Sequence, residues 1–106
     1  MSIYGADWLP GTIAINGTST GEIDLGKPYD FIDIRIPTLV SGTLKLTTSP
    51  ISGGTFQDLG NGVTTVATTG EYNDVWKIGG YQFIKIVSSA TQTTTARVFY
   101  VRGVRI

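Results

Sequence analysis

The sequence predicts an all-β fold, a sandwich or small barrel of about eight antiparallel strands. Apolar residues recur with period two along most of the 106 residues, and turn residues interrupt the alternation. Interruptions about every eight to twelve positions are typical of such folds. Sixteen Thr and 14 Gly favour pleated strands and tight turns over helices. A chain of this length buries roughly 65% of its surface on folding, enough for one modest core.

The first half of the chain contains four expected strands, each with apolar side chains at alternate positions so that one face is buried. The clearest alternation lies in residues 29–36 (YDFIDIRI), where a strand gathers three isoleucines on one face and a helix would spread them. Pro37 ends this strand because proline cannot donate to a ladder. The Asn-Gly dipeptide at 16–17 predicts a hairpin turn. The four strands and their inward residues are 11–16 with Ile13 and Ile15, 20–25 with Ile23 and Leu25, 29–36 with Ile32, Ile34 and Ile36, and 42–48 with Leu44 and Leu46.

The second half contains less regular expected strands, separated by glycine-rich turns. In residues 71–78 the pattern does not show which face of the strand is buried, although Tyr72 and Trp76 lie on the same face. Residues 95–102 (TARVFYVR) are apolar on both faces, which predicts a central strand or one covered by a neighbouring subunit. The expected strands are 55–59, 63–68, 71–78, 81–88 with Ile84 and Ile86 on one face, and 95–102.

Residues 1–10 are expected to form an N-terminal arm ahead of a single β-sandwich domain at 11–106. The arm carries large apolar side chains, but Gly5, Pro10 and Gly11 argue against a regular element there. Two interpretations stay open. The arm covers one open end of the sandwich, or it reaches another chain, since exposed aromatic arms rarely stay unpaired in water.

Composition argues against catalysis. The chain has no Cys and no His, which removes disulfides, thiolate sites and the commonest metal ligand and general base. Glu22 and Asp24 are the pair of carboxylates considered as an acid/base couple, because they lie about 7 Å apart on one face of a strand. We do not expect them to act in this way, since an open sheet surface neither excludes water nor raises the pKa of one carboxyl to that of a general acid. We therefore expect no enzyme activity and no cofactor. Bound calcium stays an open alternative, because the segments 58–61 and 71–74 are rich in oxygen ligands. Neither segment has the spacing of an EF-hand loop.

The charge balance gives little attraction for polyanions. Eight basic and eight acidic side chains cancel, so we expect no nucleic acid and no membrane as partner. The start of the chain lacks a secretory signal pattern, and no apolar run approaches the ~20 residues that span a bilayer. Arg97, Arg102 and Arg105 cluster near the C-terminus. They either pair on a sheet edge or meet a negative patch on a partner.

Aromatic residues suggest a second function, carbohydrate binding. Flat rings stack on pyranose faces, and the candidate sugar platform consists of Tyr72, Trp76 and Tyr81, with Trp8 as a further aromatic and Gln57 and Asn73 as polar neighbours. The alternative is that the two tryptophans belong to the core or cap an edge.

Two stretches carry a likeness to known proteins. Residues 70–102 (GEYNDVWKIGGYQFIKIVSSATQTTTARVFYVR) contain Gly-Gly-Tyr, a strand FIKIV, a Thr/Ser/Gln-rich hairpin and a last apolar strand. The second stretch is residues 31–59 (FIDIRIPTLVSGTLKLTTSPISGGTFQDL). It contains an expected strand, a short gap followed by another strand, and a loop followed by Phe-x-Asp-Leu. Over roughly residues 29–103 the chain resembles small virion structural proteins of tailed bacteriophages. Gly79, Gly80 and Tyr81 match the turn, and 83–87 match the strand after it.

The resemblance implies a jelly-roll-like β-sandwich in a virion, although the strand periods alone do not separate a jelly roll from an immunoglobulin-like order. It implies synthesis in the host cytoplasm and a head decoration (cement) protein, a head fibre or spike base, or a tail-tip component. The implied partners are the major capsid or tail protein of the same virion and further copies of the chain, a trimer being favoured. The expected contact residues lie at the two chain ends: Ile3, Tyr4, Trp8, Phe99, Arg102, Arg105 and Ile106.

Overall fold

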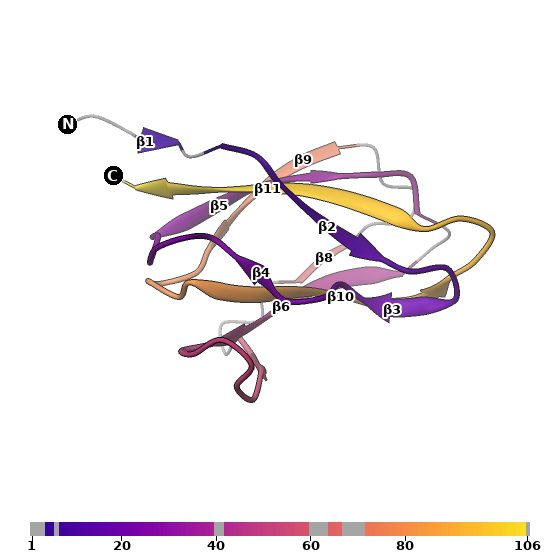
Figure 1. Ribbon diagram of the computed structural model, residues 1–106. Coiled ribbons are helices and arrows are strands. Elements are labelled where there is room, and N and C mark those ends of the chain that lie inside the picture. Colours follow the sequence, from indigo (N-terminus) through magenta and orange to yellow (C-terminus); the bar gives the residue numbers. More distant parts are fainter. Residues whose placement is uncertain (1–3, 6, 40–41, 60–63, 67–71, 106) are drawn as a thin grey trace.

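The computed structural model describes residues 4–5, 7–39, 42–59, 64–66 and 72–105, and every regular element in them is a β-strand (Figure 1). No part of these residues forms a helix long and apolar enough to cross a membrane. The strands are β1 (Tyr4–Gly5), β2 (Leu9–Ile13), β3 (Gly17–Ser19), β4 (Ile23–Asp24), β5 (Phe31–Ile36), β6 (Thr43–Ser49), β7 (Gln57–Asp58), β8 (Thr64–Val66), β9 (Tyr72–Lys77), β10 (Phe83–Gln92) and β11 (Arg97–Arg105).

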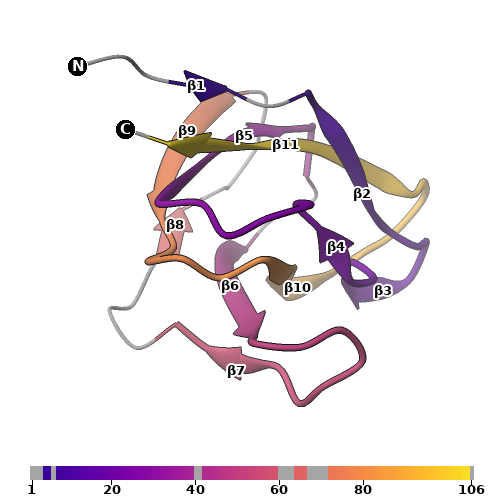
Figure 2. The ribbon, with the colours of Figure 1, turned by 60° about the vertical axis from the view of Figure 1, so that its left-hand side comes forward.

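The strands form two antiparallel sheets that pack face to face (Figure 2). In sheet A the order is β1-β11-β5-β9, and β2 also pairs with β11. In sheet B the order is β3-β10-β6-β7, with β4 on β10 and β8 on β6. Three pairs of short segments share a partner strand, so the eleven described segments amount to eight strands. The predicted all-β sandwich of about eight strands is confirmed.

The strand order is that of a jelly roll. The first long strand, β2, pairs with the last strand, β11. The next segments, β3 and β4, pair with the second-to-last strand, β10. Further inward β5 pairs with β9, and β6 with β7 and β8. The chain is therefore one long double ribbon, which is rolled up so that β11 also meets β5 and β10 also meets β6. This nested order settles the choice that the strand periods left open.

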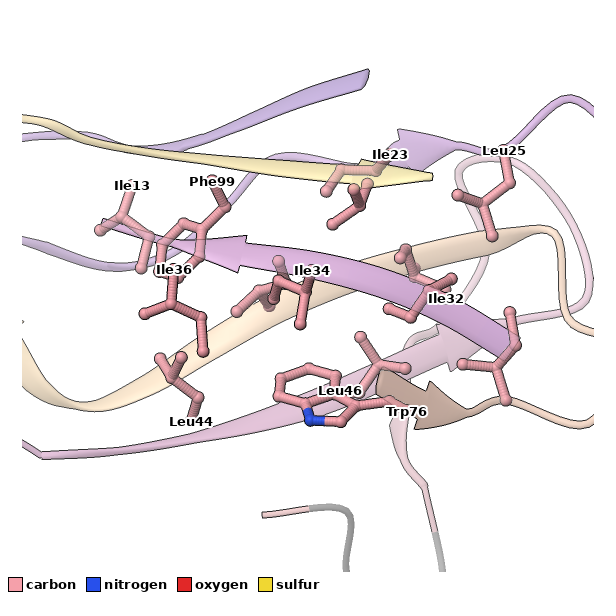
Figure 3. Close-up of a cluster of buried hydrophobic side chains, with 14 of the residues drawn as sticks. Ile13, Ile23, Leu25, Ile32, Ile34, Ile36, Leu44, Leu46, Trp76 and Phe99 are labelled. Carbon is pink, nitrogen blue, oxygen red and sulfur yellow. The ribbon is translucent and has the colours of Figure 1, made fainter. Parts of the chain in front are cut away.

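The core lies between the sheets and is made by the alternation read in the sequence (Figure 3). In β5 three isoleucines point inward, and the strands opposite supply leucines and further isoleucines. All the inward residues predicted for the first half are buried except Ile15, which is 53% exposed. Ile15 lies in the turn between β2 and β3, where Asn16 adopts a φ of 66° and the Gly17 N–H donates to the Ala14 carbonyl. The turn thus lies one residue earlier than predicted, and Ile15 points outward.

The N-terminal segment is more regular than its sequence suggested. The expectation that Gly5, Pro10 and Gly11 would prevent a regular element is wrong, because residues 4–5 and 9–13 both pair with β11. An edge strand tolerates proline, since one side of its ladder faces solvent. A side chain at Gly11 would meet the end of the Ile23 side chain, which shows how closely β2 approaches the core there.

Strand β10 runs four residues beyond the predicted end at 88. The pairing with β3 shifts register between Val87 and Gln92, which indicates a β-bulge. Gln92 is fully buried, and its amide nitrogen donates to the Ser88 hydroxyl and the Ala90 carbonyl, both at 3.1 Å. These bonds satisfy polar groups inside the bulge and allow the strand to continue through a Ser/Thr-rich sequence.

Candidate functional site

The outer face of sheet A carries four of the large exposed apolar side chains. Trp8 is 41% exposed, Tyr100 46%, Val75 59% and Val98 36%. Monomeric proteins rarely expose contiguous apolar patches of this kind without a function. We call this surface the A face; it consists of Trp8, Pro10, Thr12, Asp33, Arg35, Asn73, Val75, Lys77, Val98, Tyr100 and Arg102.

One row of the A face is held rigid by Arg102. It lies opposite Asp33 in the β11–β5 register, and its Nε donates to the Asp33 Oδ2 at 2.9 Å. The guanidinium carbon also lies 4.9 Å from the centre of the Trp8 ring. Guanidinium stacking on an indole adds to the ion pair and limits rotation of both side chains. A preordered Trp–Arg–Asp row loses little entropy when a partner docks.

A second row presents an aromatic ring beside a free cation. Tyr100 is flanked across the strands by Pro10 on β2 and by Arg35 on β5. Arg35 is exposed, and it makes no ion pair or hydrogen bond with the described residues. Trp, Tyr and Arg are the residues most enriched among energetic hot spots of protein interfaces.

The outer face of sheet B is different in character. Its cations are engaged within the chain: Lys45 pairs with Asp58 at 3.0 Å, and the Lys85 amine lies 4.5 Å from the centre of the Phe56 ring. A hollow of about 280 Å³ beside Lys45 is lined by Thr43, Val87, Ser88 and Ser89, and it contains no exposed aromatic ring. The contrast between the two outer faces makes the A face the candidate docking surface.

The predicted contact residues divide between surface and core. Trp8 and Arg102, far apart in the sequence, meet on the A face. Phe99 is a correction: it is fully buried in the core, so it does not form a contact surface, and its neighbours Val98 and Tyr100 face outward instead. Arg105 is exposed opposite Tyr4 at the end of β11. Ile3, Ile106 and the side chain of Tyr4 lie outside the described part.

Of the three residues in the predicted sugar platform, the structure places one in a surface hollow. Trp76 is a correction, because it is only 4% exposed and its indole N–H donates to the Asp74 Oδ2 at 3.1 Å. The side chain of Tyr72 is not among the described ones, although its backbone belongs to β9. Tyr81 lies in a hollow of about 320 Å³ at one end of the sandwich, lined by Pro28, Pro50, Gly79, Gly80, Tyr81 and Gln82.

The carboxyl pair Glu22 and Asp24 supports loops. The Gly53 N–H at 2.7 Å and the Ser52 hydroxyl at 2.6 Å hold the pKa of Glu22 below its ordinary 4.5. The Gln82 amide and the Gly26 N–H lower the pKa of Asp24 from 3.8. Neither carboxyl has the raised pKa that a general acid requires.

The oxygen-rich segments considered for calcium give no cluster in the described residues. Asp58 is paired with Lys45, and Asp74 accepts bonds from the Trp76 indole and the Val75 N–H. Asn61 and Glu71 lie outside those residues. Asp74, on β9 at an edge of the described sheet, lies opposite Ile34, and its carboxylate accepts the Val75 N–H. An inward-facing charge at a sheet edge discourages the addition of another strand there.

Loss of the Glu22 hydrogen bonds on acidification gives a testable expectation. A lowered folded-state pKa adds stability that is complete above the unfolded value near 4.5 and disappears as the pH falls through the folded value. The Glu22→Gln variant should therefore melt below the wild type at pH 7, and the gap should close towards pH ~2.5. Thermal unfolding followed by circular dichroism measures it. A gap that is equal at both pH values would contradict the assignment.

Sequence reasoning did not single out Arg35, Val75, Val98 or Tyr100 as contact residues. The signal for the β11 pair was present, because residues 95–102 read as apolar on both faces. The outward parity of Arg35 was also readable from β5. The sequence does not contain the pairing register of β11 with β5 and of β5 with β9, which brings these residues together on one face.

No protein-family model matches the chain. No curated protein sequence matches it either. Solved structures do resemble the fold. The SPBc2 prophage-derived protein YomS superposes with a TM-score of 0.55 at 16% identity, over 93% of this chain and 94% of that one. A family 89 glycoside hydrolase from Clostridium perfringens, in complex with 2-acetamido-1,2-dideoxynojirmycin, superposes with a TM-score of 0.51 at 14% identity, over 91% of this chain.

The two neighbours differ in extent. The chain spans nearly all of YomS but only 14% of the glycoside hydrolase, so there it matches one small part of a much larger protein. At these identities the likeness shows the fold alone. The chain is thus a jelly-roll β-sandwich module with a prophage-derived structural neighbour.

Proposed function

We propose that the chain is a non-enzymatic structural protein of a phage particle that acts by surface contact, with the A face as its docking surface. In this proposal it is a decoration or cement protein that binds the major capsid or tail protein of its own virion. The observation that carries the proposal is the exposure of four large apolar side chains on the outer face of one sheet: Trp8, Val75, Val98 and Tyr100. The likeness to a prophage-derived protein over nearly its whole length supports the virion setting.

The docking surface can be tested with two tyrosine variants. Tyr100→Ala removes a ring from the A face, and Tyr81→Ala removes a second exposed ring, at 38% exposure, that is not part of the A face. Purified chains are titrated onto particles made from a genome that lacks this gene, and bound chain is measured by co-sedimentation. We expect Tyr100→Ala to bind about tenfold more weakly or worse, with Tyr81→Ala equal to the wild type.

The opposite ranking, or a wild-type chain that does not bind the particles, would contradict the proposal. Where particles fail to form without the gene, the variants are supplied in trans and compared by incorporation. The homo-oligomer expected from the sequence, with a trimer favoured, stays a prediction. Sedimentation velocity of the purified chain measures it.

A second candidate function is carbohydrate binding, favoured by the hollow around Tyr81. There an exposed ring lies between two prolines and two glycines, with the Gln82 side chain at its rim. Such a ring can stack on a pyranose while the amide contacts a hydroxyl. A glycan array separates the two functions: hits that Tyr81→Ala abolishes and Tyr100→Ala retains support the sugar site, and an array without hits counts against it.

A further inference from the structure

We propose that the partner surface of the A face is an acidic protein surface, whose carboxylate pairs with Arg35 inside an otherwise apolar contact. This inference rests on the proposed function and adds the chemistry of the partner. It follows from the charges of the A face, the lack of an ion-pair or hydrogen-bond partner for Arg35 among the described residues, and the bonding of the chain's described carboxyls.

The outward positions of sheet A carry a surplus of positive charge. On strands β11, β5 and β9 these positions hold three cations, Arg35, Lys77 and Arg102, and one carboxylate, Asp33. Asp33 is already bonded to Arg102. The whole chain is neutral, so this surplus is local to one face. A docking partner with negative charge is attracted to that face, and one with positive charge is repelled.

Arg35 is the cation best placed to recognise a carboxylate. Its planar guanidinium offers paired N–H donors that match a carboxylate in two parallel bonds. Tyr100 and Asn73 are its cross-strand neighbours, and Val75 lies two residues further along β9. When a partner covers Tyr100 and Val75, it removes water around Arg35. A desolvated arginine without a counter-charge is costly, so the fitting partner brings a carboxylate to that point.

A second copy of this chain fits the A face less well. Face-to-face pairing about a twofold axis would bring two sets of the three cations together. Pairing with another surface of a copy needs a free carboxyl, and five of the seven described carboxyls already have hydrogen-bond or ion-pair partners. These five are Glu22, Asp24, Asp33, Asp58 and Asp74. The charges therefore favour a different protein as the occupant.

The test compares charge reversals on the two outer faces. Arg35→Glu and the control Lys45→Glu change the net charge equally, but Lys45 lies on the outer face of sheet B. Both variants and the wild type are titrated onto the gene-deleted particles described above, after circular dichroism has verified their folding. We expect Arg35→Glu to bind about thirtyfold more weakly and Lys45→Glu to stay within about twofold. Wild-type binding should weaken as salt rises from about 0.05 to 0.5 M.

A zero-length cross-link tests the carboxylate directly. Arg35→Lys keeps the charge and introduces a primary amine, which a carbodiimide joins as an amide to a partner carboxyl in contact, with loss of water. Mass spectrometry should find position 35 linked to an Asp or Glu of a particle protein. A link to another copy of this chain would identify a self-interface and overturn the inference.

Failure of the inference is separable from failure of the proposed function. If wild type and Arg35→Glu bind the particles equally, the acidic partner is wrong while the particle protein stands. If wild type does not bind, the proposed function itself is wrong.

Discussion

Phe99→Ala is expected to lower the free energy of unfolding by about 3–5 kcal/mol, a large part of the stability of a domain this small. Phe99 is the largest of the fully buried side chains and lies on β11, which pairs on both sides. Figure 3 shows its ring packed beside Ile13 and Ile36. Truncation removes the ring contacts and leaves a cavity that can close only in part, because β11 is held by a neighbouring strand on each side.

Val98→Ala is the matched control for this prediction. Val98 precedes Phe99 on the same strand but faces outward, so its truncation should change the unfolding free energy by no more than about 0.5 kcal/mol. Denaturant unfolding of the two variants measures both values. Equal losses would contradict the assignment of Phe99 to the core and Val98 to the surface.

Gly103→Ala is expected to cost about 1–3 kcal/mol or more, although alanine is usually harmless in a strand. Gly103 lies in β11 opposite Ile32, and the buried ring of Tyr29 covers it. A methyl group on Gly103 would overlap Cγ, Cδ2 and Cε2 of that ring. These atoms belong to the rigid ring base, so either the ring or the strand must shift.

Gly21→Ala is the control glycine, because nothing lies within 4 Å of an added methyl group there. It should leave stability unchanged or raise it by up to about 1 kcal/mol through the lower entropy of the unfolded chain. The melting temperatures of both variants give the comparison. A Gly103→Ala protein as stable as Gly21→Ala would contradict the packing of Tyr29 on β11.

The sequence was most informative where one face of a strand is buried and the other is polar. In β5 the isoleucines alternate with Asp33 and Arg35, so the inward face was readable without any knowledge of the partner strands. In β11 both parities are apolar, and the sequence could not distinguish Phe99, which is buried, from Tyr100, which is exposed. The difference arises from tertiary packing, because only one face of β11 meets sheet B.

Local side-chain hydrogen bonds and the position of a strand at a sheet edge explain the other departures. Trp76 reads as a possible surface ring, but Asp74 two residues away accepts its indole proton and allows it to be buried. Gln92 lies in a polar segment typical of a loop, and the bulge at Ser88 and Ala90 satisfies its amide. Pro10 is tolerated in β2 because that strand forms an edge. Each outcome depends on a partner that pattern reading does not supply.

The candidate site was partly predictable for a similar reason. Trp8 and Arg102 were expected at a contact surface because they belong to the two chain ends. Their stacking depends on the pairing of the last strand with β2, and the Asp33 ion pair depends on the pairing of that strand with β5. Arg35 became a candidate contact residue only from the structure, which places it beside Tyr100 and without an ion-pair partner in the described residues.

A cryo-electron microscopy reconstruction of the phage particle, with this chain resolved, tests the central claim most directly. It should show Trp8, Val75 and Tyr100 covered by a capsid or tail protein, with a carboxylate of that protein against Arg35 and Tyr81 left in solvent. A particle that holds the chain with the A face open to solvent, or that lacks the chain altogether, would contradict the account.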